Sequence, residues 1–467
     1  MTYYREVKNA LRRELLPGVF IPALYRFSPY QGCGHACLYC DGRAEKYYVE
    51  GDFESDIGVK DNMPDILRME LGCFPEDGAG KKHGTETIQP ALFDEMDFVE
   101  GTELESSLPS AFPKQELPRQ LPLPQRDWGA VSVGSGISDV YQPVEQDEQV
   151  TRRCLTVLKE SGAGLPVTIL TKSALILRDF DLLTSIAEQA LVRYAGPDSG
   201  RLPVLILTTI TTTCTETASV LEPGASPPEE RLELIRRARE AGFYAGVMAM
   251  PLVPYITDGT PAASPVIPGS DPAELFRAAA EAGAECIIPG GLTLRPGRQK
   301  DIYMETLRQK WPALYSDYEW IYGEQRRSGA PRREFYRDRP GYWAAELEKL
   351  CIPSGIPHYI YRSLLSEADS LFTLLCHMEY LYASRGIETR GLRDAAGRYS
   401  EWLKLRRTAL RRKRAWVTEE LTRELREMTA GDGFEKLTGN PRLSSFVREI
   451  VNSGRNFNYI TGKTEHS

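Results

Sequence analysis

Three cysteines lie within eight residues of one another and are the clearest chemical signal in the sequence. Residues 28–40 read SPYQGCGHACLYC, which places Cys33, Cys37 and Cys40 in a C-x-x-x-C-x-x-C arrangement. Thiolates at this spacing can bind zinc or an iron–sulfur cluster, whereas a redox dithiol requires only the C-x-x-C part and leaves Cys33 unexplained. The stretch therefore indicates a metal site.

A fourth ligand is not evident near this motif. His35 is wedged between two of the cysteines, and the other six cysteines and four histidines of the chain are scattered. Iron–sulfur clusters are normally held by four cysteines. Three cysteines thus predict a [4Fe–4S] cluster with one iron open to a small molecule. Zinc binding, or a loop with three buried cysteines and no metal, are the alternatives.

Short apolar runs followed by amphipathic helices must position this motif. The expected strands are residues 23–30, 130–136, 166–172, 204–211, 244–253 and 284–294. The expected helices are residues 146–160, 179–190, 228–242 and 272–283, and one from about 299. Strands without clean alternation, each followed by a helix, indicate a parallel sheet covered by helices. Six such units fit an open doubly wound sheet or an incomplete barrel. In both, chemistry belongs at the carboxyl ends of the strands, where the cysteines follow the first strand.

Two segments interrupt this pattern. Residues 74–126 are acidic and rich in proline and glycine, which predicts an insertion loop. Residues 340–467 are expected to be mostly helical. One helix near 400–428 has an apolar face made of Leu403, Leu410, Val417, Leu421, Leu425 and Met428. We therefore expect an N-terminal segment (1–19), an α/β domain (20–320) and a helical C-terminal region (321–467).

Composition narrows the class of protein. The 467 residues are 42% hydrophobic and 26% charged, as in ordinary globular proteins. The N-terminal residues lack the apolar stretch of a signal peptide, and no apolar run approaches the roughly 20 residues that span a bilayer. The chain has nine cysteines, and the six outside the motif lie far apart, which fits a reducing compartment. We expect a soluble, cytoplasmic protein, and the net charge of −8 argues against one that coats duplex nucleic acid.

The cysteine motif, with an aromatic residue before its last cysteine, resembles the signature of the radical S-adenosyl-L-methionine (SAM) superfamily. Further blocks resemble the spore photoproduct lyase-related, "DNA repair photolyase" group. These blocks are GSGISDVYQPVE (134–145), TILTKSALILRDFDLL (168–183), TITTTCTETASVLEPGASPPEERL (209–232), MPLVPYITD (250–258) and LTLRPGRQKDIY (292–303). The cysteine motif is specific for the superfamily, and the later blocks are specific for the group but not for a substrate.

The resemblance implies a fold, two cofactors and a reaction. The fold is an incomplete (β/α)6 radical SAM barrel, here followed by the helical C-terminal region. The cofactors are a [4Fe–4S] cluster on the three cysteines and SAM on the open iron. The enzyme would cleave SAM to a 5′-deoxyadenosyl radical, which abstracts a substrate hydrogen. A flavodoxin or ferredoxin would supply the electron.

The resemblance also assigns residues to SAM: Tyr39, Gly134, Gly136, Ser138, Asp139, Lys172 and Thr209. Tyr39 would pack near adenine, the glycines would let the backbone approach the methionine part, and Lys172 would meet the carboxylate or the ribose. The ordinary alternatives are a strand-end lysine and turn or strand hydroxyls. Four further matches are expected to hold loops in place: Arg178, Asp179, Glu222 and Arg231.

Two positions depart from the lyases proper. Gly136 stands where these lyases have a cysteine that donates hydrogen, and Asp41 stands where they have a tyrosine. Cys214 and Tyr141 are the candidate replacement donors. The expected substrate is a nucleic-acid base. The alternatives are a peptide or small metabolite, or a non-enzymatic iron–sulfur or zinc protein acting as sensor or scaffold. The basic run at 403–416 is interpreted as a solvated helix face.

Overall fold

The strands of the main sheet lie side by side in the order in which they occur in the sequence. The computed structural model describes residues 1–44, 51–73, 121–134, 136–193, 200–261 and 267–465, so most of the predicted insertion loop 74–126 lies outside the described residues. Within them, a seven-stranded sheet has the order β10-β9-β8-β7-β6-β3-β2. The strands are β2 (Arg12–Arg13), β3 (Tyr25–Phe27), β6 (Val131–Val133), β7 (Val167–Thr171), β8 (Leu202–Thr209), β9 (Phe243–Leu252) and β10 (Ile287–Gly291). All neighbours are parallel except β2, which pairs with β3 in antiparallel register. The predicted parallel sheet is confirmed.

A helix follows each parallel strand of the main sheet, and after β3 it comes beyond the two short strands β4 (Tyr30–Gln31) and β5 (Ile57–Val59). These helices are α1 (Met63–Glu70), α4 (Val150–Glu160), α5 (Phe180–Arg193), α7 (Pro228–Glu240), α8 (Pro272–Glu281) and α9 (Arg298–Lys310). Shorter helices precede α4 and α7, namely α3 (Glu145–Glu148) and α6 (Thr215–Leu221). Because β3, β6, β7, β8, β9 and β10 are parallel, these six strands bring their carboxyl ends to the same edge of the sheet. That edge is where the cysteine loop lies.

The two faces of the sheet are covered by different helices. Along β8, Val204 and Ile206 belong to the core shared with α5 and α7, whereas Leu205 and Leu207 pack with residues of α13 (His358–Leu364). This alternation is the two-residue period of a strand buried on both faces. Helix α13 covers only part of its face. The remainder, toward the carboxyl ends, lines a cavity.

A small second sheet, not foreseen from the sequence, supports the cysteine loop. It has the order β1-β5-β4 and consists of β1 (Thr2–Tyr4), β4 (Tyr30–Gln31) and β5 (Ile57–Val59). The short strand β4 leads directly into the cysteines. Pairing with β5 therefore anchors the start of the loop.

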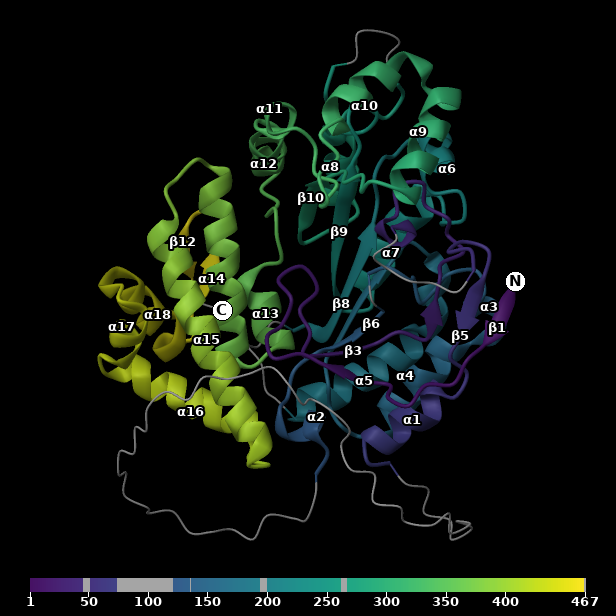
Figure 1. Ribbon diagram of the computed structural model, residues 1–467. Helices are drawn as coiled ribbons and strands as arrows, with labels where there is room; N and C mark the ends of the chain where they lie inside the picture. Colours follow the sequence, from purple (N-terminus) through teal and green to yellow (C-terminus); the bar gives the residue numbers. More distant parts are fainter. Residues whose placement is uncertain (45–50, 74–120, 135, 194–199, 262–266, 466–467) are drawn as a thin grey trace, which may run out of the picture.

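The C-terminal region is helical, as predicted, and has its own core. It comprises α14 (Glu367–Ser384), α15 (Arg390–Arg412), α16 (Val417–Ala430), α17 (Gly433–Thr438), α18 (Pro441–Ser453) and the hairpin β11 (Asn456–Asn458) and β12 (Lys463–Glu465). These elements lie beside the sheet in Figure 1. The helices α10 (Tyr315–Tyr322), α11 (Arg333–Tyr336) and α12 (Arg339–Lys349) come before them. No helix among the described residues is both long and apolar enough to cross a membrane.

The single helix predicted near 400–428 is wrong. The chain turns between α15 and α16, where Arg414 has a positive φ of 55°. The apolar pattern continues across the turn because Leu410 and Val417 pack into the same core from two different helices. A shared apolar face therefore does not require one continuous helix.

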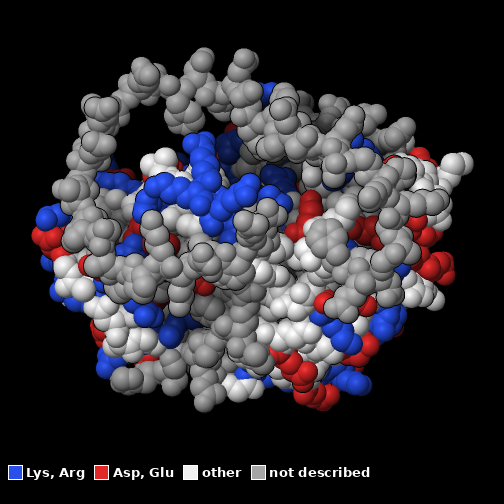
Figure 2. Space-filling view, turned by 90° about the horizontal axis from the view of Figure 1, so that it is seen from below, with Lys and Arg blue, Asp and Glu red and all other residues white. Residues whose placement is uncertain are grey.

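Buried ion pairs join the helical region to the amino end of the sheet. Arg407 is fully buried between Asp369, at 2.6 Å from its Nη2, and Asp127, at 3.2 Å from its Nε. Arg411 Nε lies 2.6 Å from the other oxygen of Asp127. Two arginines of the basic run at 403–416 therefore form structural ion pairs instead of a fully solvated helix face. Lys413 and Arg414, just after α15, are exposed. Figure 2 shows Lys and Arg side chains gathered on the face of the molecule seen from below.

Candidate active site at the carboxyl end of the sheet

The three cysteines line one cavity. Cys33 and Cys37 are each 6% exposed and Cys40 is half-buried, and all three are free thiols. The cavity has a volume of about 400 Å³ and extends from the cysteine loop to the carboxyl ends of the strands. This size lies within the range of roughly 300–1,000 Å³ that small-molecule sites occupy.

Strand periodicity explains which strand residues reach the cavity. Leu170 and Lys172 are two residues apart at the end of β7, and Met248 and Met250 are two apart on β9. Residues two apart point to the same face of a sheet. Together with Thr209 of β8, all four line the cavity. The sequence analysis identified Lys172 and Thr209 but missed the two methionines, because apolar strand residues carry no signal of a site.

Polar side chains hold the backbone of the cysteine loop. Buried Arg43 donates to the carbonyl oxygens of Ala36 (2.9 Å) and Cys37 (3.1 Å). Gln142 Oε1 accepts from Gly34 N at 2.7 Å. Gly32 has a φ of +78°, and a Cβ there would lie 2.9 Å from two backbone oxygens, so this turn requires glycine. These contacts order the loop before any ligand binds.

Asp139 positions the cysteine loop through His35. His35 Nδ1 donates to the Gly224 carbonyl at 2.7 Å, and its Nε2 lies 3.2 Å from Asp139 Oδ2. The same carboxylate accepts from Thr171 Oγ1 (2.8 Å) and Lys172 N (2.8 Å). Burial alone would raise the pKa of Asp139, but His35 and the backbone N–H groups of Tyr141 and Lys172 lower it to about 2. The carboxylate is therefore charged and joins the loop to β7.

Lys172 presents a cation to the cavity. Its Nζ lies 5.9 Å from the centre of the Tyr39 ring, and among the described residues it forms no ion pair within 4 Å. Burial by itself would lower the pKa of Lys172, but Cys37 and Glu222 raise it to about 12. The side chain is thus an ammonium group directed at the same space as the thiols.

A buried network fixes Tyr39. Its hydroxyl donates to Glu222 Oε1, and Arg231 Nη1 lies 2.7 Å from Glu222 Oε2. Arg231 also donates to the carbonyl oxygen of Thr209 at 2.7 Å. Tyr39 therefore lines the cavity, and its hydroxyl is held in place by Glu222. The loop-holding role expected for Glu222 and Arg231 agrees with these contacts.

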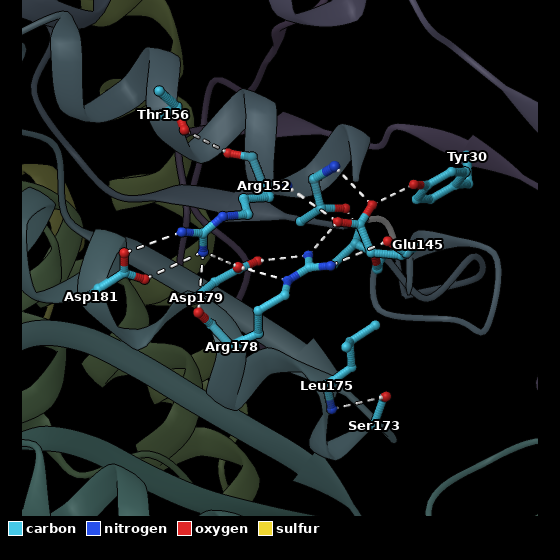
Figure 3. Close-up of polar contacts among 11 residues, drawn as sticks. Tyr30, Glu145, Arg152, Thr156, Ser173, Leu175, Arg178, Asp179 and Asp181 are labelled. Carbon is cyan, nitrogen blue, oxygen red and sulfur yellow. Dashed lines mark hydrogen bonds and ion pairs between the residues drawn. The ribbon is translucent and has the colours of Figure 1, made fainter. Parts of the chain in front are cut away.

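Figure 3 shows a second polar network, formed by residues that follow β6 and β7 together with Tyr30. Glu145 accepts from the Tyr30 hydroxyl and from Arg178 Nη2, the latter at 2.6 Å. Arg178 Nε lies 2.9 Å from Asp179, which also pairs with Arg152 at 2.5 Å. None of these five residues lines the cavity. They connect the start of the cysteine loop to the helices after β6 and β7.

The remaining predicted residues divide into two groups. Gly136 and Ser138 line the cavity, and the Ser138 hydroxyl donates to the Gly32 carbonyl at 2.7 Å. Gly134, Tyr141 and Cys214 are not among its lining residues.

Of the two candidate hydrogen donors, Tyr141 is fully buried, and burial together with Asp179 raises the pKa of its hydroxyl. Cys214 caps α6 and is half-buried. Their proposed role as donors stays a prediction.

The three cysteine thiols line one shared cavity. Within the described residues, no three His, Cys, Asp or Glu side chains converge closely enough to hold a single ion. In a four-iron cluster each cysteine binds a different iron, so the thiols need only surround a shared space. Burial raises the pKa of Cys33 to about 12 and also raises that of Cys40. The thiols would bind iron by releasing protons, which the Lys172 cation favours at Cys37 and Cys40.

Comparisons with known proteins give distant relatives. No family model matches the chain. An uncharacterised protein of Mycobacterium tuberculosis is 26% identical over 344 residues, which cover 73% of this chain and 79% of the relative. An uncharacterised protein of Methanocaldococcus jannaschii is 23% identical over 253 residues, covering 54% of this chain and 69% of the relative.

The similar solved structures are variants of spore photoproduct lyase. One matches with a TM-score of 0.42 and 15% identity, over 76% of this chain and 80% of the lyase chain. Another, with bound AdoMet and dinucleoside spore photoproduct, matches with a TM-score of 0.35 and 15% identity, over 67% and 66%. Because these TM-scores and identities are low, the functional argument rests on the geometry of the site itself.

Proposed function

We propose that the protein is a radical SAM enzyme in which Cys33, Cys37 and Cys40 hold a [4Fe–4S] cluster. The observation that carries the proposal is that the three thiols of one loop line a ligand-sized cavity at the carboxyl ends of parallel strands. When bound and reduced, such a cluster supplies the electron that cleaves SAM and yields a 5′-deoxyadenosyl radical for hydrogen abstraction. We include in the proposal that the six parallel strands form an incomplete (β/α)6 barrel.

The chain's own residues would bind and orient SAM. Lys172 would pair with the SAM carboxylate, since its ammonium has no ion pair among the described residues. The Tyr39 ring would pack against adenine, and Gly136, Ser138 and Thr209 would line the path between them. Asp139 would act as a positioning residue, because its oxygens are already engaged by the loop and β7. Leu170, Met248 and Met250 would exclude water from this space.

The substrate would differ from that of the lyases proper. Gly136 lines the cavity at the position of their hydrogen-donating cysteine, and Asp41 lines it at the position of their tyrosine. Asp41 is also paired with Arg295 at 3.3 Å. We therefore do not assign thymine-dimer reversal by that relay. A nucleic-acid base is the first substrate class to test, and a peptide or small metabolite is the second. A flavodoxin or ferredoxin would be the electron donor.

Anaerobic reconstitution tests the proposal. We expect about four irons and four sulfides per chain in the wild type, and 5′-deoxyadenosine after addition of SAM and dithionite. Cys37→Ala should lose the product, whereas Cys376→Ala, in α14 outside the cavity, should keep it. Zinc in place of iron, or equal product from both variants, would contradict the proposal and favour the sensor or scaffold alternative.

A further inference from the structure

A second cavity adjoins the cysteine cavity. It has a volume of about 570 Å³ and shares Asp41, Gly136 and Ile137 with the cysteine cavity. Three basic side chains line it: Arg12, Arg26 and Lys60. A molecule lying across Ile137 would therefore contact basic groups at one end and the cysteine cavity at the other.

The sheet places two of these cations opposite each other. Arg12 on β2 and Arg26 on β3 are register partners in the antiparallel pair, so their side chains leave the same face. Opposed residues in such a pair have Cβ atoms about 4.5–5.5 Å apart, and like charges there are destabilising. Arg12 pairs with Glu14 at 3.1 Å on the exposed side. The Arg26 side chain forms no ion pair among the described residues, and its buried Nε lacks an acceptor.

The third cation is also incompletely paired. Lys60 Nζ donates to the Ser28 carbonyl at 2.7 Å, which uses one of its three hydrogens. Burial, helped by Arg5, lowers the pKa of Lys60 to about 8. The carboxylate that borders the cavity, Asp41, is engaged by Arg295 and by Gln299 at 3.1 Å. The cavity thus carries an excess of positive charge.

We propose that this basic cavity binds an anionic oxygen group of the substrate, a phosphate or a carboxylate, while the reacting part lies in the cysteine cavity. An anion between Arg12 and Arg26 would relieve their repulsion and give the Arg26 Nε its missing acceptor. This inference rests on the proposed function, because it assigns one end of the substrate of that site. It also narrows the substrate class to molecules with an acidic group close to the hydrogen that is removed.

Binding of inorganic phosphate and of acetate tests this site directly. Both are titrated into the full-length reconstituted protein at constant ionic strength, with isothermal calorimetry as readout. Arg26→Ala should weaken binding by roughly 10-fold or more, as expected for a lost hydrogen bond to a charged group. Arg13→Ala is the matched control, because it removes the same charge from the neighbouring residue, which is in register with Tyr25 and faces the other side. It should change affinity by less than about twofold.

A second variant keeps the test decisive if Arg26→Ala does not fold. Arg12 lies on an exposed edge strand, so Arg12→Ala should fold and still weaken binding. Tighter binding of phosphate than acetate assigns a phosphate group, and the reverse order assigns a carboxylate. No binding of either anion, or equal losses in Arg12→Ala, Arg26→Ala and Arg13→Ala, would overturn the proposal. Iron content and SAM binding, measured on the same samples, are independent of this outcome. A protein that holds iron and binds SAM but ignores both anions contradicts the anion site alone.

Discussion

The two ends of the sheet both bury charged groups, but they do so in different ways. At the amino end, Arg407 is enclosed by Asp127 and Asp369, and its Nη1 donates to the Leu15 carbonyl. At the carboxyl end, Lys172 and the cysteine thiols face a cavity, and the Lys172 ammonium has no ion pair among the described residues. In the first arrangement the Arg407 cation has two carboxylate partners from the protein itself, whereas in the second the Lys172 cation has none among the described residues.

This difference separates structural charges from functional ones. Removing one member of a closed buried ion pair leaves its partner buried and uncompensated, which strongly destabilises the fold. Removing a buried charge that faces a cavity leaves no partner unsatisfied, and it lowers affinity for a ligand instead. Arg407 is fully buried and Lys172 is half-buried. Their partners separate the two roles, because Arg407 has two carboxylate partners and Lys172 has no ion pair among the described residues.

The largest expected effect on stability is at the closed end. Arg407→Met should lower the free energy of unfolding by about 3–5 kcal/mol, because Asp369 loses its cation. Urea unfolding measures this change. Arg412→Met, at the exposed end of the same helix, is the control and should stay within about 0.5 kcal/mol. SAM affinity of the folded Arg407→Met protein should equal that of the wild type. A loss of SAM binding would break the comparison.

The next effect is at the open end. Lys172→Met should weaken SAM binding by roughly 10- to 100-fold, which corresponds to one charge-assisted hydrogen bond. Its free energy of unfolding should fall by much less than that of Arg407→Met, because Cys37 and Glu222 favour the Lys172 cation but Glu222 keeps its ion pair with Arg231 when the lysine is removed. Equilibrium dialysis with SAM and urea unfolding are the two measurements. Lys159→Met, on the exposed surface of α4, is the control. Destabilisation by several kcal/mol would instead make Lys172 a structural residue.

A smaller effect is expected on the stability of the fold when the pH is lowered. Burial lowers the pKa of His377 to about 4, and burial with Arg362 lowers that of His358 to about 3. Unfolded histidines titrate near pH 6.5. The unfolded chain therefore binds more protons below that value, so stability is fully present above about pH 6.5 and falls toward pH 4. Hydrogen exchange should show that amides of α13 and α14 lose protection at pH 5 before those of β7 and β8. The opposite order would contradict this assignment.

Sequence patterns predicted the strands, their parallel order and the position of the cysteines well, because these depend on local periodicity and on a short motif. Contacts between distant segments were not predictable in this way. Nothing in the sequence near Gln142 indicates that it would bind the backbone of Gly34, and Arg43 gave no sign of holding the cysteine loop. The Arg12–Arg26 pair was also missed, because β2 is two residues long and carries no periodic signal.

The most direct test of the central claim is electron paramagnetic resonance of the anaerobically reconstituted, dithionite-reduced protein, with and without SAM. The account predicts a [4Fe–4S]⁺ signal that changes when SAM is added, in the wild type and in Cys376→Ala alike. It also predicts that Lys172→Met needs more SAM to reach the same change. A cluster signal that does not respond to SAM would contradict the claim that the cavity beside the cysteines is a SAM site.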